Sequence, residues 1–119
     1  MAGPNIVNVA RIFGNTVVQN VITSATNILS NPAASDKVFK INSLIISNID
    51  GTNTADVTAT LFRNNASFAL ASTIAVPADA SLIVISKDIS IYLEEGDSIR
   101  LTASANNRLQ AVCSYEDIS

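Results

Sequence analysis

Apolar and polar residues alternate along most of the chain after residue 36, with the period of two that is typical of β-strands. The clearest case is residues 98–104, in which Ile99, Leu101 and Ala103 take one set of positions and polar residues take the other. Such alternation predicts a strand with one buried and one solvated face. We therefore expect strands rather than helices in this part of the chain.

Turn-forming residues divide this region into short runs. The runs cover residues 38–49, 55–63, 67–76, 82–86, 89–93, 98–104 and 109–116. Asp50-Gly51 and Asn64-Asn65 are turn signals, and Pro77 ends a strand because it cannot donate to a ladder. This spacing predicts an all-β fold, an antiparallel β-sandwich of Ig-like or jelly-roll-like form.

The alternation also assigns inward faces to individual strands. In the first run it places Phe39, Ile41, Ile45 and Ile49 on one face, in the second Val57, Ala59 and Leu61, and in the third Phe68, Leu70, Ile74 and Val76. The other face of the first run carries Val38, Leu44 and Ile46 as well, which favours a central or covered strand.

The first third of the chain has a different pattern. Residues 6–13 and 16–23 are both β-capable and are separated by Gly14-Asn15, but their faces mix apolar and polar side chains. We expect either an N-terminal β-hairpin or an extended β arm that completes its hydrogen bonds on another subunit. The predicted division is residues 1–35 for this arm or hairpin and residues 36–119 for the β-sandwich domain.

Composition limits the partners. A chain of 119 residues is long enough for one domain, and its charged content of 14% lies well below the roughly 25% of average soluble domains. Uncharged polar surface favours close packing of subunits, so a homo-oligomer is expected. A formal net charge of -3 with scattered basic residues predicts no nucleic-acid partner, and the absence of a long apolar run predicts no membrane partner.

The residue types argue against catalysis. The sequence contains no histidine, the commonest general base and a frequent metal ligand, so we expect no enzyme and no catalytic, cofactor-binding or metal residues. Cys113 is the single cysteine, which excludes an intrachain disulfide. Its register with Leu109 and Ala111 predicts a buried, inert thiol.

Two acidic turns and two tyrosines are the remaining candidates for a site. Glu94, Glu95 and Asp97 form the densest acidic cluster, and a second candidate loop covers residues 50–53. Both are interpreted as tight turns, with Ca²⁺ or ligand binding as the alternative. Tyr92 and Tyr115 are expected at the edge of the core rather than as sugar-stacking platforms.

Residues 36–119 resemble small virion proteins of tailed bacteriophages, particularly of cyanophages. The resemblance rests on the strand order and on the segments VPADASLIV, YLEEGDSIRLTASA and SYEDIS. It implies a capsid decoration or cement protein that is made in the host cytoplasm and binds the major capsid protein on the virion. A homo-oligomer, with a trimer matching the threefold points of the shell, is the expected assembly. The alternatives are a tail, baseplate or fibre-associated structural module, and a Ca²⁺- or glycan-binding β-sandwich.

Overall fold

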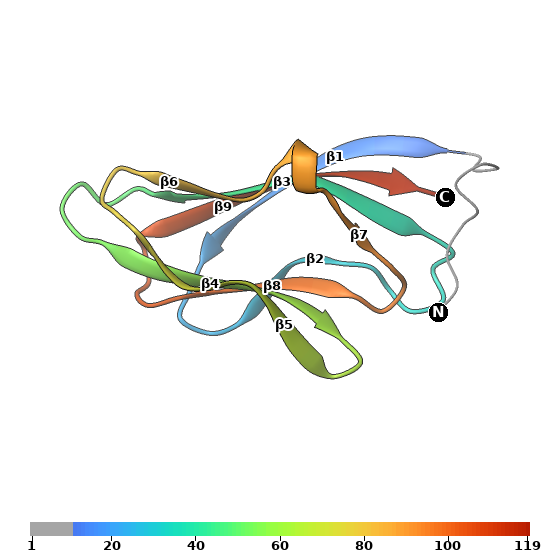
Figure 1. Cartoon of the computed structure of the whole chain (residues 1–119), viewed down its shortest axis with the longest axis horizontal. Helices are drawn as coiled ribbons and strands as arrows, with labels where there is room; N and C mark the ends of the chain where they lie inside the picture. Colours follow the sequence, from blue (N-terminus) through green and yellow to red (C-terminus); the bar gives the residue numbers. More distant parts are fainter. Residues whose placement is uncertain (1–10) are drawn as a thin grey trace.

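The computed structural model describes residues 11–119, which form two antiparallel sheets packed face to face (Figure 1). The β1 sheet has the order β1 (Ile12–Val21), β9 (Leu109–Ile118), β3 (Val38–Asn48) and β6 (Ser81–Ile85), and β7 (Ile91–Leu93) also pairs with β3. The β2 sheet has the order β2 (Thr26–Ser30), β8 (Ser98–Ala103), β4 (Ala55–Arg63) and β5 (Ala66–Val76). A short 3-10 turn, η2 (Lys87–Ile89), lies between β6 and β7. The predicted all-β sandwich is confirmed.

The core forms where the alternation is cleanest. On β4 and β8 the buried residues include Val57, Ala59, Ile99 and Leu101, as expected from the sequence. Asn64 and Asn65 have φ angles of 53° and 60°, which suits a two-residue hairpin turn between β4 and β5.

Residues 11–119 contain no helix that is long and apolar enough to cross a membrane.

The predicted inward face of β3 is wrong beyond its middle. Phe39 and Ile41 face the core, but the pairing of β3 with β9 shifts by one residue between Ile41 and Ser43. A one-residue shift moves every following side chain to the opposite face. Leu44 and Ile46 are therefore fully buried in place of Ile45 and Ile49, and Ile49 is 54% exposed.

The predicted inward stripe of β5 is only partly correct. Val76 is buried and Leu70 packs against the core, but Phe68 is 56% exposed and Ile74 is 40% exposed. β5 is an edge strand whose pairing with β4 shifts register twice, and Thr73 has a positive φ of 50°. Phe68 and Ile74 still lie opposite the inward-facing Leu61 and Val57 of β4, so their exposure follows from the position of β5 at the edge of the sheet.

The expected N-terminal hairpin turn at Gly14-Asn15 is absent, because β1 runs straight through these residues. β1 pairs with β9 and β2 pairs with β8, so each adds an outer strand to one of the two sheets. The physical reason is that these sheet edges satisfy many more backbone groups than an isolated ribbon, which is marginal in water. This corrects the separate arm or hairpin predicted for residues 1–35: residues 12–30 belong to the sandwich, whereas residues 1–10 lie outside the described residues.

Candidate functional site

The acidic corner between β7 and β8 is built around Asp97, which is completely buried. Its carboxylate accepts hydrogen bonds from the Glu94 amide at 2.9 Å, from Arg63 Nε at 2.8 Å and from Arg63 Nη2 at 2.5 Å. The hydrogen bonds to Asp97 raise the pKa of Arg63 above its ordinary value, so the guanidinium stays charged. Gly96, with a φ of 84°, permits the tight turn. The corner therefore fastens the end of β4 to the start of β8.

Two further side chains join this corner to the loop between β2 and β3. Glu95 Oε2 accepts a hydrogen bond from the Asp36 amide at 2.6 Å. Asn31 is fully buried, and its side-chain Nδ2 donates to the carbonyls of Lys37 at 2.9 Å and Leu93 at 3.0 Å. The interpretation of the corner as a turn fits this geometry, but the sequence did not reveal Arg63 and Asn31 as its partners.

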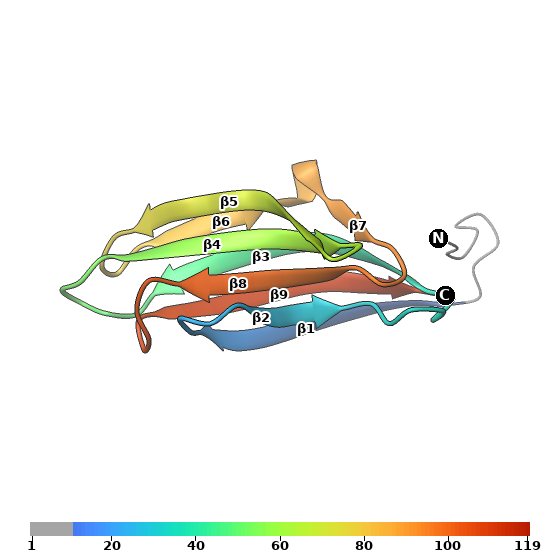
Figure 2. The same ribbon diagram turned by 90° about the horizontal axis from the view of Figure 1, so that it is seen from below.

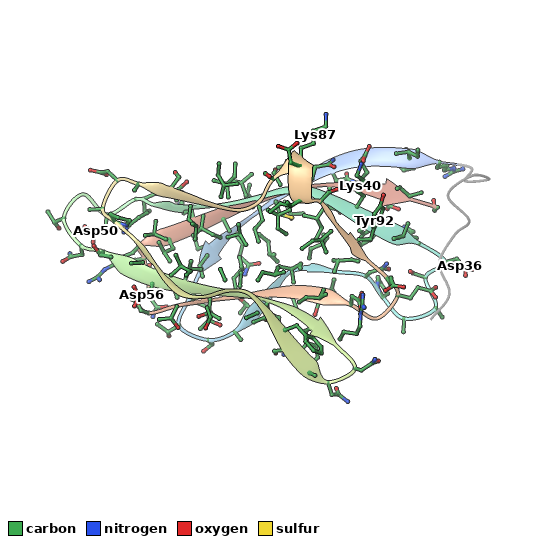
Figure 3. The ribbon with its side chains drawn as sticks, in the orientation of Figure 1. Asp36, Lys40, Asp50, Asp56, Lys87 and Tyr92 are labelled. Carbon is green, nitrogen blue, oxygen red and sulfur yellow. The ribbon has the colours of Figure 1, made fainter. Side chains whose placement is uncertain are left out.

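The second acidic candidate, the loop after β3, is a turn held by Asp50, whose Oδ2 also lies 3.6 Å from Arg108 Nε. Asp50 Oδ1 accepts hydrogen bonds from the Thr52 amide at 2.8 Å and the Asn53 amide at 3.1 Å. The first of these, together with the side-chain and backbone hydrogen bonds from Asn53, holds the pKa of Asp50 well below its usual range. Asp50 and Asp36 lie at opposite ends of the sandwich (Figure 3), so the two acidic turns do not converge on one site.

The carboxylates of Asp50, Glu95 and Asp97 in these turns already accept hydrogen bonds from protein donors. A cation at Asp97 would have to displace the Arg63 guanidinium, which already supplies the compensating charge. Among residues 11–119, no group of three or more Asp, Glu, His or Cys residues is placed to hold a metal ion.

The cysteine and the tyrosines separate into buried and exposed groups. Cys113 is fully buried, and burial raises the pKa of its thiol to about 11, so the thiol is protonated near neutral pH. Tyr115 is half-buried and packs against Phe39 with ring centroids 5.0 Å apart. Tyr92 differs from its expected place at the core edge: it pairs with Lys40 on the outer face of the β1 sheet and is 45% exposed.

An apolar row crosses the outer face of the β1 sheet. It consists of Val18, Val112, Ile45 and Ile83, which lie directly opposite one another on β1, β9, β3 and β6. Val18 is 73% exposed, Val112 39% and Ile83 63%, while Ile45 is half-buried. Four neighbouring β-branched side chains in one line give the sheet a continuous apolar surface that no described segment covers.

Uncharged polar rows flank the apolar row on both sides. On one side lie Asn20, Gln110, Ser47 and Ser81, with Gln110 Nε2 donating to Asn20 Oδ1 at 3.2 Å and the two serine hydroxyls 3.0 Å apart. On the other side, the hydroxyls of Thr16 and Ser114 are 3.2 Å apart. These hydrogen bonds hold the polar side chains in place, and the centre of the face carries no charge. A shallow hollow of about 450 Å³ opens here, lined by Val18, Gln19, Asn20, Gln110, Ala111 and Val112.

The outer face of the β2 sheet has a different character. Thr58 lies opposite Thr102 across β4 and β8, and Thr60 lies opposite Arg100. The Arg100 guanidinium stacks over the Phe62 ring, 3.5 Å from its centroid, and so covers that apolar group. The two outer faces are therefore unequal, and the apolar row marks the β1 sheet as the better docking surface.

The apolar row is not predictable from the sequence alone. Its members come from four strands, and only the register between strands brings them into line. The alternation moreover predicts Ile45 in the core, because the bulge in β3 has no clear sequence signal.

Comparison with known proteins supports the fold class. No protein-family model matches the chain, and no curated protein matches it. A solved structure described under "Bacillus endospore appendages form a novel family of disulfide-linked pili" has a similar fold, with a TM-score of 0.54 over 91% of this chain and 88% of that chain. The sequence identity is 17%, so the similarity shows a shared two-sheet sandwich and nothing about function.

Proposed function

We propose that this chain is a non-enzymatic structural protein of a phage virion, a decoration or cement protein that binds the lattice of the major capsid protein. The resemblance of residues 36–119 to small phage virion proteins supports the setting. The apolar row on the β1 sheet is the observation that carries the docking role. Contiguous exposed apolar patches on folded domains mark interaction surfaces.

The proposed contact is a flat sheet face that a capsid protein covers. Fully burying a Val or Ile side chain contributes about 1.5–3 kcal/mol. The exposed members Val18, Val112 and Ile83 are already partly covered in the free protein. Burying each of them on binding therefore contributes about 1–2 kcal/mol. Association costs roughly 4–15 kcal/mol in lost freedom, so a single such face binds weakly unless the flanking polar rows also make contacts. A capsid lattice offers many equivalent binding positions, so a modest affinity at each position is compatible with decoration of the shell.

The appendage with a similar fold is described as a disulfide-linked pilus. That mode of linkage does not extend to this chain, because its single cysteine, Cys113, is fully buried in β9. We therefore propose that its contacts are noncovalent.

The test is binding of the purified protein to capsids that have been assembled without it, measured by co-sedimentation. Val112→Asp puts a charge in the centre of the apolar row and is expected to weaken binding about tenfold or more, since a buried unpaired charge is costly. Thr102→Asp, on the outer face of the β2 sheet, is the matched control and should bind as the wild type does. Equal binding by both variants would refute the assignment of the docking face.

A location in the tail, as a baseplate or fibre-associated module, is the alternative form of the same proposal. Copy number in purified virions distinguishes the two. A number comparable to that of the major capsid protein supports the shell, and a number far below it supports the tail.

A further inference from the structure

β1 presents a long free edge at one margin of the sandwich (Figure 2). Its ten residues pair with β9 one to one, without a register shift. Just before it, Arg11 and Ser119 exchange both backbone hydrogen bonds, at 2.9 and 3.0 Å. Because such exchanged pairs alternate along an antiparallel ladder, odd-numbered residues of β1 bond to β9. The amide and carbonyl groups that point away from the sheet belong to Ile12, Gly14, Thr16, Val18 and Asn20.

The other sheet edges carry features that hinder pairing with a further strand. β5 has two register shifts, and β2 has five residues and one shift. On the remaining edge, β6 and β7 have five and three residues and are separated by η2 with its charged Lys87. β1 has ten residues and no shift, and it contains neither proline nor a charged side chain. Proteins normally protect such an edge, so an unprotected one indicates a partner.

Gly14 is a second and independent indication. Glycine weakens the interior of a strand unless a backbone or ligand must approach closely. Its φ lies outside the positive range, and a Cβ added at this position would meet nothing within 4 Å in the chain. Nothing within the described residues therefore requires glycine here.

We propose that β1 pairs antiparallel with β1 of a second copy, about a twofold axis at Thr16. In this register Thr16 faces Thr16 of the second copy, Gly14 faces Val18 and Ile12 faces Asn20. All of the outward-pointing residues then exchange hydrogen bonds, and both apolar rows stay on the same side of the joined sheet. A slip by one residue would match outward-pointing groups with inward-pointing ones and would turn the second copy over.

The twofold arrangement follows from the edges themselves. Pairing of β1 with a different edge would need β2, β5 or the β6–β7 edge, each of which is irregular or short. Pairing of β1 with itself uses up both free edges and closes at two copies. This replaces the threefold assembly expected from the capsid setting by a dimer, and it does not depend on the proposed binding to a capsid.

The first test uses the free chain and sedimentation at high micromolar concentration. The wild type is expected at about 25 kDa, twice its mass of 12.5 kDa. Thr16→Pro removes an outward N–H in both copies and leaves the backbone bonds to β9 intact, so the dissociation constant should rise about tenfold or more. It also loses the hydroxyl contact with Ser114, as Thr16→Val does. Thr16→Val keeps the N–H and should remain dimeric. A monomeric wild type, a Thr16→Pro variant with an unchanged dissociation constant, or open-ended filaments would overturn the proposal.

The second test does not depend on the folding of the proline variant. In Thr16→Cys the two introduced thiols lie in facing residues, whose Cα atoms are about 5.5 Å apart in such a pair. A short bis-maleimide should therefore link two copies. In Asn20→Cys the thiols are eight residues apart along the ladder, about 27 Å, and should not be linked. Because Cys113 is buried, the wild type is the reagent control. Linking of Asn20→Cys but not of Thr16→Cys would exclude the proposed register.

Discussion

Removal of the Arg63 side chain tests whether the acidic corner holds the sandwich together. Arg63→Ala would leave the Asp97 carboxylate fully buried with one remaining hydrogen bond, from the Glu94 amide at 2.9 Å. Breaking a buried ion pair by removing one partner costs about 3–5 kcal/mol. Since the Arg63 side chain is 32% exposed, water screens part of the interaction. We therefore expect Arg63→Ala to lower the free energy of unfolding by about 3 kcal/mol.

The assay is urea unfolding followed by circular dichroism, with thermal unfolding in parallel. A loss of about 3 kcal/mol corresponds to roughly 10 °C in Tm for a domain of this size. Arg63→Lys keeps the charge but loses the two-pronged geometry, so it should fall between the wild type and Arg63→Ala. Lys40→Ala is the matched control, because its Nζ lies 3.9 Å from Glu116 Oε2 in a partly exposed pair that contributes about 0–1 kcal/mol.

The result that would refute this reasoning is a loss below about 1 kcal/mol for Arg63→Ala, comparable to that of the surface pair. The double variant Arg63→Ala with Asp97→Asn gives a further check. Removing the stranded charge should recover part of the lost stability, since the penalty arises from a buried carboxylate without its cation. No recovery would mean that Arg63 acts through packing rather than through charge.

Three further predictions concern the same fold. Asn31→Ala should cost about 2–3 kcal/mol in urea unfolding, because the part-buried carbonyl of Lys37 and the buried carbonyl of Leu93 lose their donor. Gly96→Ala should cost about 1 kcal/mol because φ is 84°, whereas Gly14→Ala in β1 should change monomer stability by less than about 0.5 kcal/mol. Burial raises the pKa of Cys113 from 9.0 to about 11, so the unfolded chain releases this proton first. The stability that the protonated thiol contributes is therefore full below pH 9 and falls between pH 9 and 11, and Cys113→Ala should flatten that part of the measured pH profile.

The sequence predicted the fold class because local alternation and turn chemistry agree along most of the chain. β4, β8 and β9 follow the period of two closely, and Asn64-Asn65 and Pro77 end strands for reasons that are visible in single residues. Buried positions such as Ile99 and Cys113 could therefore be identified without a structure.

The predictions failed where the structure depends on pairing between strands. The shift between Ile41 and Ser43 exchanges the two faces of β3, although the residues around it are ordinary strand formers. The β1 segment looked like half of a hairpin because Gly14-Asn15 resembles a turn, but the long edge of β9 offered a better partner. The same limitation concealed the apolar row and the partnership of Arg63 with Asp97, whose members are distant in sequence.

The two proposed contacts use different parts of one sheet and can therefore operate together. The β1 edge bonds through backbone groups in the plane of the sheet, whereas the apolar row projects from its outer face. Twofold pairing at Thr16 would place two apolar rows on the same side of one continuous sheet, so a dimer would present two docking faces to a lattice. Two linked faces bind more tightly than one, provided that the lattice spacing lets both engage. Thr16→Pro, which leaves the apolar row intact, should then weaken capsid binding through the loss of bivalency alone, and joining two such variant copies by a flexible linker should restore it.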